Sequence, residues 1–337
     1  MTDADEFRAP WYGLPAASDE AVCDVKAFNP SSLFLRDVLV IDPPIEHGQP
    51  PEPTTSSSSA PPFLASANVP FQLVLSHRSR RPVLAFLIHH KRLDKRILFD
   101  LSLFEEWQSW LGEAARGYQQ EFNVEISSDG NLVQQLEKVG VEADDVDVVL
   151  LSHKHFDHTG RPSAFKNAVI WIHEDEKDSV PALRDVSAQN IKPFKFDAKD
   201  RKPVASFDDS LDLFGDESIV IVAVPGHTPG HVGALVRTER DKFVLLGADG
   251  CHHRLLLNGT IDEQRKYKLG CAKDDPMYED YSEASKSLAR LRRAKQDDNV
   301  LVVTAHDERQ WDAWCKHEQK RIIDLNDWKQ RGLKEIL

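Results

Sequence analysis

The stretch SHKHFDHTG, residues 152–160, places three histidines and an aspartate within six positions, directly after an apolar run at 146–151 that predicts a buried strand. A tight turn after a strand can aim alternate residues at two neighbouring points. His153 and His155 can meet one ion, and Asp157 and His158 on the next bend can meet a second. Imidazole and carboxylate are ligands that zinc and iron prefer, so the stretch indicates a metal site. The alternative interpretation is a polar surface turn.

Three more candidate ligands each follow another predicted buried strand. They are His227 after the strand at 219–224, Asp249 after the strand at 243–247, and His306 after the strand at 300–304. Sites in open α/β sheets form where the carboxyl ends of strands meet, so these side chains are expected to converge with the first stretch on one edge of a sheet.

The surrounding pattern predicts a mixed α/β sandwich, because strands and helices alternate while several strands are close enough for hairpins. Helices are expected at 103–121, 132–138 and 281–295. Further strands are expected at the following positions: 33–41, 71–75, 83–89, 96–101, 168–173 and 233–237.

Residues 42–62 contain seven prolines and four consecutive serines, a composition that cannot bury much apolar area and predicts a loop. The expected organisation is therefore an N-terminal extension at 1–64, a catalytic domain at 65–310 and a helical tail at 311–337. The extension is not needed for the site. It is expected to cap the site or to form an interface, and a homodimer is one expected arrangement.

Composition excludes several functional classes. The chain has 337 residues, with 42 Lys plus Arg against 55 Asp plus Glu, a net charge of −13 that disfavours binding to nucleic acid or to an anionic membrane. No apolar run approaches the roughly 18 residues that a membrane span needs. The acidic amino terminus does not resemble a signal peptide, and the four cysteines lack ligand spacing, so a cytoplasmic protein with reduced thiols is expected.

In order and spacing, the motif HxHxDH at 153–158, followed by His227, Asp249 and His306, resembles the metallo-β-lactamase superfamily. The resemblance covers residues of about 65–310 and implies a four-layer αββα sandwich. It also implies a first metal held by His153, His155 and His227, a second held by Asp157, His158 and His306, and Asp249 as a bridge between them. The branch most similar to this sequence contains acyl-homoserine lactonases and related ring-opening hydrolases, whose opening hairpin ends in an aspartate, here Asp100.

This resemblance implies a hydrolase with two Zn²⁺ ions, or with Fe, Mn or Co in their place, that uses a bridging hydroxide. The implied substrates are small cyclic esters or amides, namely lactones, lactams or cyclic carbamates, and the implied physiology is detoxification or signal degradation. Asp157 is expected to pass a proton to the leaving group. His252 stands where the lactonases have a tyrosine that contacts the substrate carbonyl, so it is expected either to make that catalytic contact or to be a loop histidine with no role. His231 is expected to be a packed structural histidine or a partner of a ligand.

Other activities of the same fold stay open at this point. They are a thioester hydrolase, a mononuclear iron sulfur dioxygenase and a non-catalytic binding protein. Two loops at 183–206 and 251–280 are long enough to select the substrate. Their expected apolar wall consists of the following residues: Phe194, Phe196, 255–257, Tyr267, Met277 and Tyr278.

Overall fold

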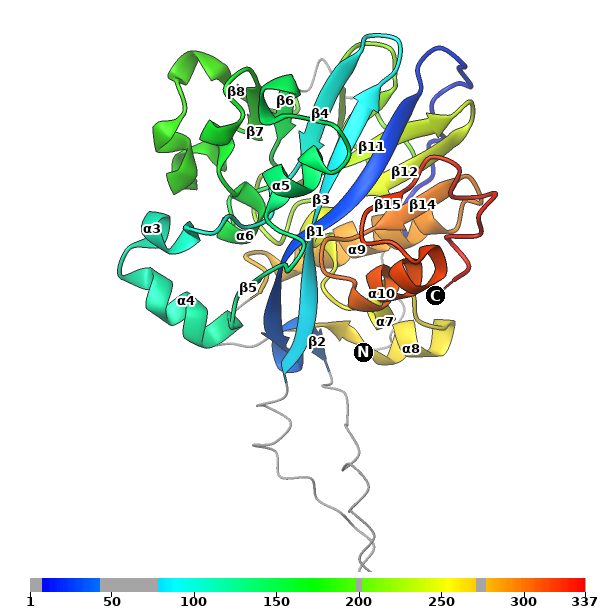
Figure 1. Ribbon diagram of the computed structural model, residues 1–337. Coiled ribbons are helices and arrows are strands. Elements are labelled where there is room, and N and C mark those ends of the chain that lie inside the picture. Colours follow the sequence, from blue (N-terminus) through cyan, green and yellow to red (C-terminus); the bar gives the residue numbers. More distant parts are fainter. Residues whose placement is uncertain (1–7, 43–77, 198–201, 271–276, 337) are drawn as a thin grey trace, which may run out of the picture.

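The computed structural model describes residues 8–42, 78–197, 202–270 and 277–336, and a large mixed β-sheet runs through it (Figure 1). Its strand order is β15-β1-β3-β4-β6-β7-β8, and β5 also pairs with β1. Pairing is antiparallel from β15 to β4 and parallel from β4 to β8. The strands are β1 (Cys23–Arg36), β3 (Arg78–His90), β4 (Lys95–Phe99), β5 (Glu125–Ile126), β6 (Val148–Leu150), β7 (Val169–His173), β8 (Ile191–Phe194) and β15 (Ile323–Asp324).

A second sheet has the order β14-β12-β11-β10-β9 and is antiparallel except for the parallel pair β12 and β14. A small antiparallel pair joins β2 to β13. These strands are β9 (Ser210–Asp212), β10 (Ile219–Ala223), β11 (Val232–Glu239), β12 (Lys242–Leu246), β14 (Val300–Val303), β2 (Ile41–Asp42) and β13 (Lys268–Leu269).

The two sheets pack face to face, as the alternation of side chains along β10 shows. Ile219 and Ile221 belong to the same interior cluster as Val148 of the larger sheet, whereas Val220 and Val222 belong to a different cluster on the outer face. Successive side chains on a strand point to opposite faces, so both sheet faces are buried in apolar contacts. The central cluster is thus the core between the sheets.

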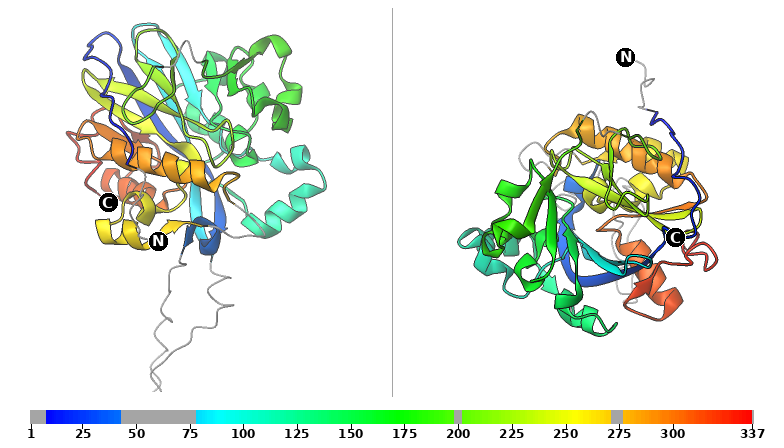
Figure 2. Two further views of the ribbon diagram at one scale, coloured as in Figure 1. Left: turned by 180° about the vertical axis from the view of Figure 1, so that it is seen from behind. Right: turned by 90° about the horizontal axis from the view of Figure 1, so that it is seen from above.

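Helices cover the two outer faces (Figures 1 and 2). Leu288 and Leu291 of α9 (Tyr281–Lys295) pack with the outer residues of the second sheet, and Leu136 of α5 (Leu132–Glu137) packs with those of the larger sheet. This confirms the predicted αββα sandwich. The other α-helices are α1 (Asp37–Val40), α3 (Trp107–Leu111), α4 (Ala114–Phe122), α6 (Phe156–Thr159), α7 (Arg254–Leu257), α8 (Ile261–Lys266) and α10 (Glu308–Glu318).

The amino-terminal region differs from its prediction as an extension. β1 pairs with β3 from Cys23 opposite His90 to Arg36 opposite Arg78, so residues 23–36 lie inside the larger sheet. The strand expected at 33–41 begins earlier and ends at Arg36, where α1 follows. The expected strand at 71–75 and all but the first residue of the predicted loop at 42–62 lie outside the described residues.

Two helical predictions are also corrected. The helix expected at 103–121 is interrupted between α3 and α4, where Gly112 has a φ of +54°, a conformation that ends a helix and favours glycine. The tail expected to be helical at 311–337 contains β15 after α10, and β15 pairs with β1. Trp314 and Trp328 of this tail are fully buried in the central core, so it is a structural part of the sandwich. Within the described ranges, every helix is too short or too polar to cross a membrane.

Candidate metal centre

The predicted ligand stretch forms a tight turn at the carboxyl end of β6. The turn carries His153 and His155 and leads into the single turn of α6. Gly160 ends α6 with a φ of +45°, and a Cβ there would lie 2.5 Å from the Cβ of Leu101. A larger residue would force the turn away from the neighbouring strand end, so the glycine allows α6 to sit directly over the sheet edge.

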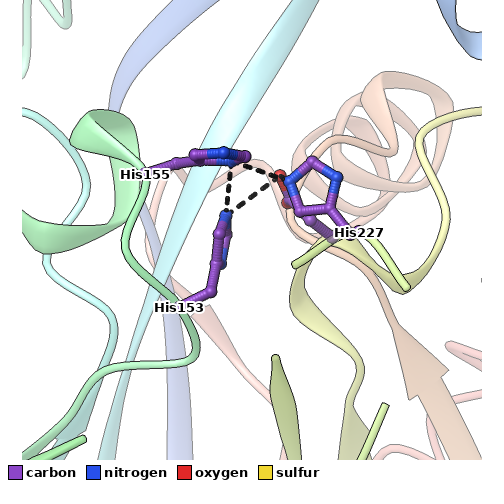
Figure 3. A group of neighbouring side chains, drawn as sticks. His153, His155 and His227 are labelled. Atoms are coloured by element: carbon purple, nitrogen blue, oxygen red, sulfur yellow. Dashed lines mark hydrogen bonds and ion pairs between the residues drawn. The ribbon is translucent and has the colours of Figure 1, made fainter. Parts of the chain in front are cut away.

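A first group of ligand atoms is formed by three histidines and an aspartate (Figure 3). His155 Nδ1 lies 3.0 Å from His153 Nε2 and 2.8 Å from His227 Nε2. The Oδ2 atom of Asp249 lies 3.2 Å from His227 Nε2 and 3.7 Å from His153 Nε2. The loops after β6 and β10 therefore bring together side chains that are more than 70 residues apart in sequence.

A second group lies on the other side of Asp249. Its members are Asp157, His158 and His306, whose ligand atoms all lie within 4.8 Å of one another. Asp249 Oδ1 is 3.1 Å from Nε2 of both His158 and His306. Asp157 Oδ2 is 3.6 and 3.5 Å from the same two nitrogens. The structure thus brings all seven predicted ligands to one sheet edge, and the two oxygens of Asp249 face different groups.

Hydrogen bonds behind the second group fix which histidine nitrogen can bind a cation. His158 Nδ1 donates to Asp100 Oδ2 at 2.7 Å, and His306 Nδ1 donates to the carbonyl oxygen of Pro82 at 2.7 Å. In a neutral imidazole the other nitrogen then carries a lone pair. Two such lone pairs face Asp249 Oδ1, and both that oxygen and His158 Nε2 are buried without a hydrogen-bond partner. Buried acceptors that face one another fit a cation between them.

The first group has the same construction. His227 Nδ1 donates to the carbonyl oxygen of Met277 at 2.7 Å. The Ser152 hydroxyl donates to Asp100 Oδ2 at 2.7 Å and accepts from His153 Nδ1 at 2.9 Å. Both histidines therefore turn an Nε2 lone pair towards the centre. The donor set of histidine nitrogens and carboxylate oxygens suits zinc or iron.

Burial and charge act differently on the two groups. Burial, with the neighbouring histidines, holds the pKa of His153 and His155 well below the ordinary value, which favours the neutral ligand form. Burial alone would also lower the pKa of His158, but the carboxylates of Asp249, Asp157 and Asp100 raise it well above the ordinary value. The second group thus favours a positive charge, which a divalent cation can supply in place of a proton.

His252 and His231 both contact Asp249. His252 Nε2 lies 3.0 Å from Asp249 Oδ2, and its Nδ1 lies 3.1 Å from the hydroxyl of Tyr278. His231 donates from Nδ1 to the carbonyl oxygen of Val224, so its Nε2 accepts the backbone N–H of Asp249 at 3.0 Å. Burial lowers the pKa of His231 to about 3 and that of His252 to about 4, which keeps both rings neutral. His231 is therefore a buried partner that orients the backbone of Asp249.

A cavity of about 170 Å³ opens onto both groups. Apolar and aromatic side chains line this cavity together with the ligands, and they are Leu33, Leu35, Leu39, Tyr118, Phe122, Phe156 and Met277. Of the wall residues expected from the sequence, Met277 lines this cavity. Residues 255–257 are buried in the outer core, and Phe194 and Phe196 pack against His173 instead.

Several residues that shape the site carry no recognisable signal in the sequence. Ser152 bonds two residues of the centre, and Leu33 and Leu35 reach the cavity from β1, which the sequence places in an extension. Asp100, which the family resemblance points to, has a φ of +58° and accepts from the backbone N–H of Ser152 at 2.7 Å. These contacts arise only when the strand ends come together.

The described cysteines and the strand histidines show no site of their own. Burial raises the pKa of Cys23 and Cys251 to about 12, so both remain protonated thiols. His90 is fully buried, with Nε2 2.9 Å from a carboxylate oxygen of Asp216. The two buried thiols agree with the reduced cysteines expected from the sequence, while Cys271 lies outside the described residues.

Replacing Asp100 with asparagine is expected to weaken metal binding at the second group about 10–100-fold, the usual effect of losing a partner of a metal ligand. An amide has one acceptor oxygen, whereas Asp100 uses both oxygens for Ser152 and His158. Zinc competition against a chromophoric chelator measures the change. Asp94→Asn, at an exposed turn, is the matched control, and equal affinities in the two variants would contradict the role of Asp100.

Comparisons with known proteins agree with this geometry. The sequence model described as "Metallo-beta-lactamase superfamily" matches residues 80–306. A protein named cytochrome P450 monooxygenase mpaDE' of Penicillium brevicompactum is 26% identical over 74% of this chain and 32% of its own length. This chain therefore spans about a third of that relative.

A protein named gamma-lactamase MBL2 of Gibberella moniliformis is 30% identical over 47% of this chain and 71% of its own length. A solved structure of an N-acyl homoserine lactone hydrolase with bound N-hexanoyl-L-homoserine superposes with a TM-score of 0.58. The two sequences are 18% identical, and the superposition covers 86% of this chain and 95% of the lactone hydrolase. This similarity shows a shared fold. Since the family match covers more than half of the sequence, this chain belongs to the metallo-beta-lactamase superfamily.

Proposed function

We propose that this protein is a metal-dependent hydrolase that binds two Zn²⁺ ions and opens a small cyclic ester or amide, such as a lactone, lactam or cyclic carbamate. The observation that carries the proposal is the position of Asp249, whose Oδ2 faces His227 and whose Oδ1 faces His158 and His306. A carboxylate placed between two groups of ligand lone pairs suits a bridge between two cations. Detoxification or signal degradation is the proposed physiology.

The proposed ligands divide into two sets that share Asp249. His153, His155 and His227 would hold the first ion, and Asp157, His158 and His306 would hold the second. When bound, a pair of divalent ions supplies a hydroxide nucleophile at neutral pH and polarises the carbonyl group under attack.

The side chains around the ions perform the remaining steps. Asp157 lines the cavity, where it can take a proton from the attacking nucleophile and pass it to the departing oxygen or nitrogen. His252 also lines the cavity, where its ring can orient Asp249 or contact the substrate.

The cavity walls favour a neutral, compact substrate. The cavity volume of about 170 Å³ can hold a small ring, and leucine, methionine and aromatic side chains line the cavity beside the ligands. Phe156 is central to that wall, with the ring of Tyr118 4.7 Å away. The name of the relative MBL2, a gamma-lactamase, supports a cyclic amide within this class.

His252→Ala is expected to lower kcat by roughly tenfold or more while the metal content stays unchanged. The substitution removes the ring that contacts Asp249 Oδ2 and borders the cavity, but leaves the seven proposed ligands intact. Steady-state kinetics and elemental analysis measure the two quantities. His317→Ala removes a half-exposed surface histidine and serves as control. An unchanged kcat would exclude a role of His252 in turnover.

The function itself is tested by metal analysis and a substrate panel. Two zinc equivalents together with hydrolysis of lactones, lactams or cyclic carbamates would support the proposal, and a chelator should abolish that activity. Turnover of thioesters alone would identify a thioester hydrolase, and one iron with persulfide oxidation would identify a dioxygenase. Absence of bound metal after expression with added zinc would favour a non-catalytic binding protein. The cytoplasmic location, the homodimer and the absence of a nucleic-acid partner stay predictions.

A further inference from the structure

Glu176 is a buried carboxylate that joins the two loops of the first ligand group. It lies in the turn after β7 and is 0% exposed. Its Oε2 accepts the backbone N–H of Lys154 at 3.1 Å, and its Oε1 accepts the backbone N–H of Gly230 at 2.7 Å. Lys154 stands between His153 and His155, and Gly230 belongs to the turn that carries His227. Each oxygen of one side chain therefore holds one ligand loop.

The packing around Glu176 leaves little freedom for these loops. A Cβ at Gly230 would lie 2.6 Å from His173 Nδ1 and 2.8 Å from Glu176 Cγ, so the turn approaches the carboxylate as closely as a glycine permits. The ammonium group of Lys154 does not neutralise the carboxylate, because it pairs with Glu279 at 2.6 Å. Backbone N–H groups therefore stabilise the buried charge, which makes both hydrogen bonds charge-assisted.

A second contact lies at the base of the same loops, where the backbone N–H of Val232 donates to the carbonyl oxygen of Ser152 at 3.0 Å. A single contact would leave the loops free to pivot about it. Glu176 supplies the contact further along both loops, at Lys154 and Gly230. Two points of attachment fix the orientation of one loop relative to the other.

We propose that Glu176 is a positioning residue that sets the spacing of the nitrogen ligands in the first group and thereby preorganises that metal site. The inference rests on the metal-binding part of the proposed function. In this role Glu176 does not touch the metal or the substrate. It keeps His153 and His155 at a fixed distance from His227 before any ion arrives, so that metal binding does not have to order the loops.

Glu176→Gln tests the proposal because glutamine has the same shape but only one acceptor oxygen. Its amide NH₂ would face one of the two backbone N–H donors, so one loop loses its attachment. We expect one of the two zinc equivalents to bind about 10–100-fold more weakly. The readout is a zinc titration of metal-free, full-length protein in competition with a chelator. His155→Ala identifies which equivalent belongs to the first group, and Glu174→Gln on the exposed side of the same turn is the control.

The outcomes of this titration distinguish a failure of the role of Glu176 from a failure of the proposed metal-dependent function. Weakening confined to the equivalent that His155→Ala removes supports it. Unchanged affinity, or equal weakening of both equivalents with a lower melting temperature of the metal-free protein, overturns it. Absence of zinc binding in the unaltered protein defeats the proposed function instead. If Glu176→Gln does not fold, Glu176→Asp is used, because it keeps the charge and both oxygens on a shorter side chain that cannot reach both loops. Full zinc affinity in that variant would also overturn the proposal.

Discussion

Replacing Asp249 with asparagine is expected to lower kcat/KM for ring opening by roughly 10²–10³-fold or more and to reduce bound zinc from two equivalents to one or fewer. Asp249 is 2% exposed and lies between both ligand groups. Asparagine keeps the shape but removes the negative charge and one acceptor oxygen. Its NH₂ group would point at one of the two groups, where it would repel a cation.

The effect should exceed that of any single histidine replacement, because Asp249 is shared by both groups. Kinetics and elemental analysis of the same preparation measure it. Asp262→Asn is the matched control, since that carboxylate is 94% exposed on α8. Full activity of Asp249→Asn with two bound ions would contradict the bridging role. Loss of activity with a changed circular dichroism spectrum would indicate that Asp249→Asn is misfolded. The variant Asp249→Glu would then be tested in its place.

Local patterns were sufficient to predict a mixed α/β sandwich, and its four layers were implied by the family resemblance. Apolar runs with turn residues between them predict β6, β10, β12 and β14, and helical spacing predicts α9 over the same residues as the structure. Such elements bury continuous faces, which leaves a clear periodic signal. β1 is harder to recognise because polar residues such as Asp24 and Lys26 alternate with its buried ones, and its partner β3 begins only at Arg78. Long-range pairing, which no local window contains, decides the position of that strand.

In the candidate site too, some residues could be predicted from the sequence and others could not. Its proposed ligands follow strand ends, so topology brings them together and sequence spacing is informative. The residues that hold the ligands in place do not follow such a rule. Glu176 resembles any acid in a polar turn, and its neighbours Glu174 and Asp175 are exposed. Tyr278 reaches His252 from a segment 26 residues away. Their roles depend on tertiary hydrogen bonds, which composition and periodicity do not record.

Asp157→Asn is expected to lower kcat by roughly 10²–10⁴-fold, the usual contribution of general acid–base catalysis, while the first ligand group keeps its metal. Asp157 borders the cavity and is 5% exposed. Its Oδ2 lies 3.5 Å from His306 Nε2, whereas Asp249 Oδ1 lies 3.1 Å from the same atom. The carboxylate of Asp157 is therefore the looser member of the second group and the better placed to carry a proton to a leaving group.

A comparison of leaving groups separates proton transfer from metal binding in this variant. An aryl ester with an acidic phenol as leaving group needs little protonation, so Asp157→Asn should reduce its hydrolysis much less than that of an alkyl lactone or a lactam. Asp178→Asn, whose side chain is 90% exposed, provides the control. An equal loss on both kinds of substrate together with loss of one zinc equivalent would show that Asp157 acts only as a ligand. An unchanged kcat would show that Asp157 has no part in the mechanism. The proton would then have to pass through another group that borders the cavity, such as His252.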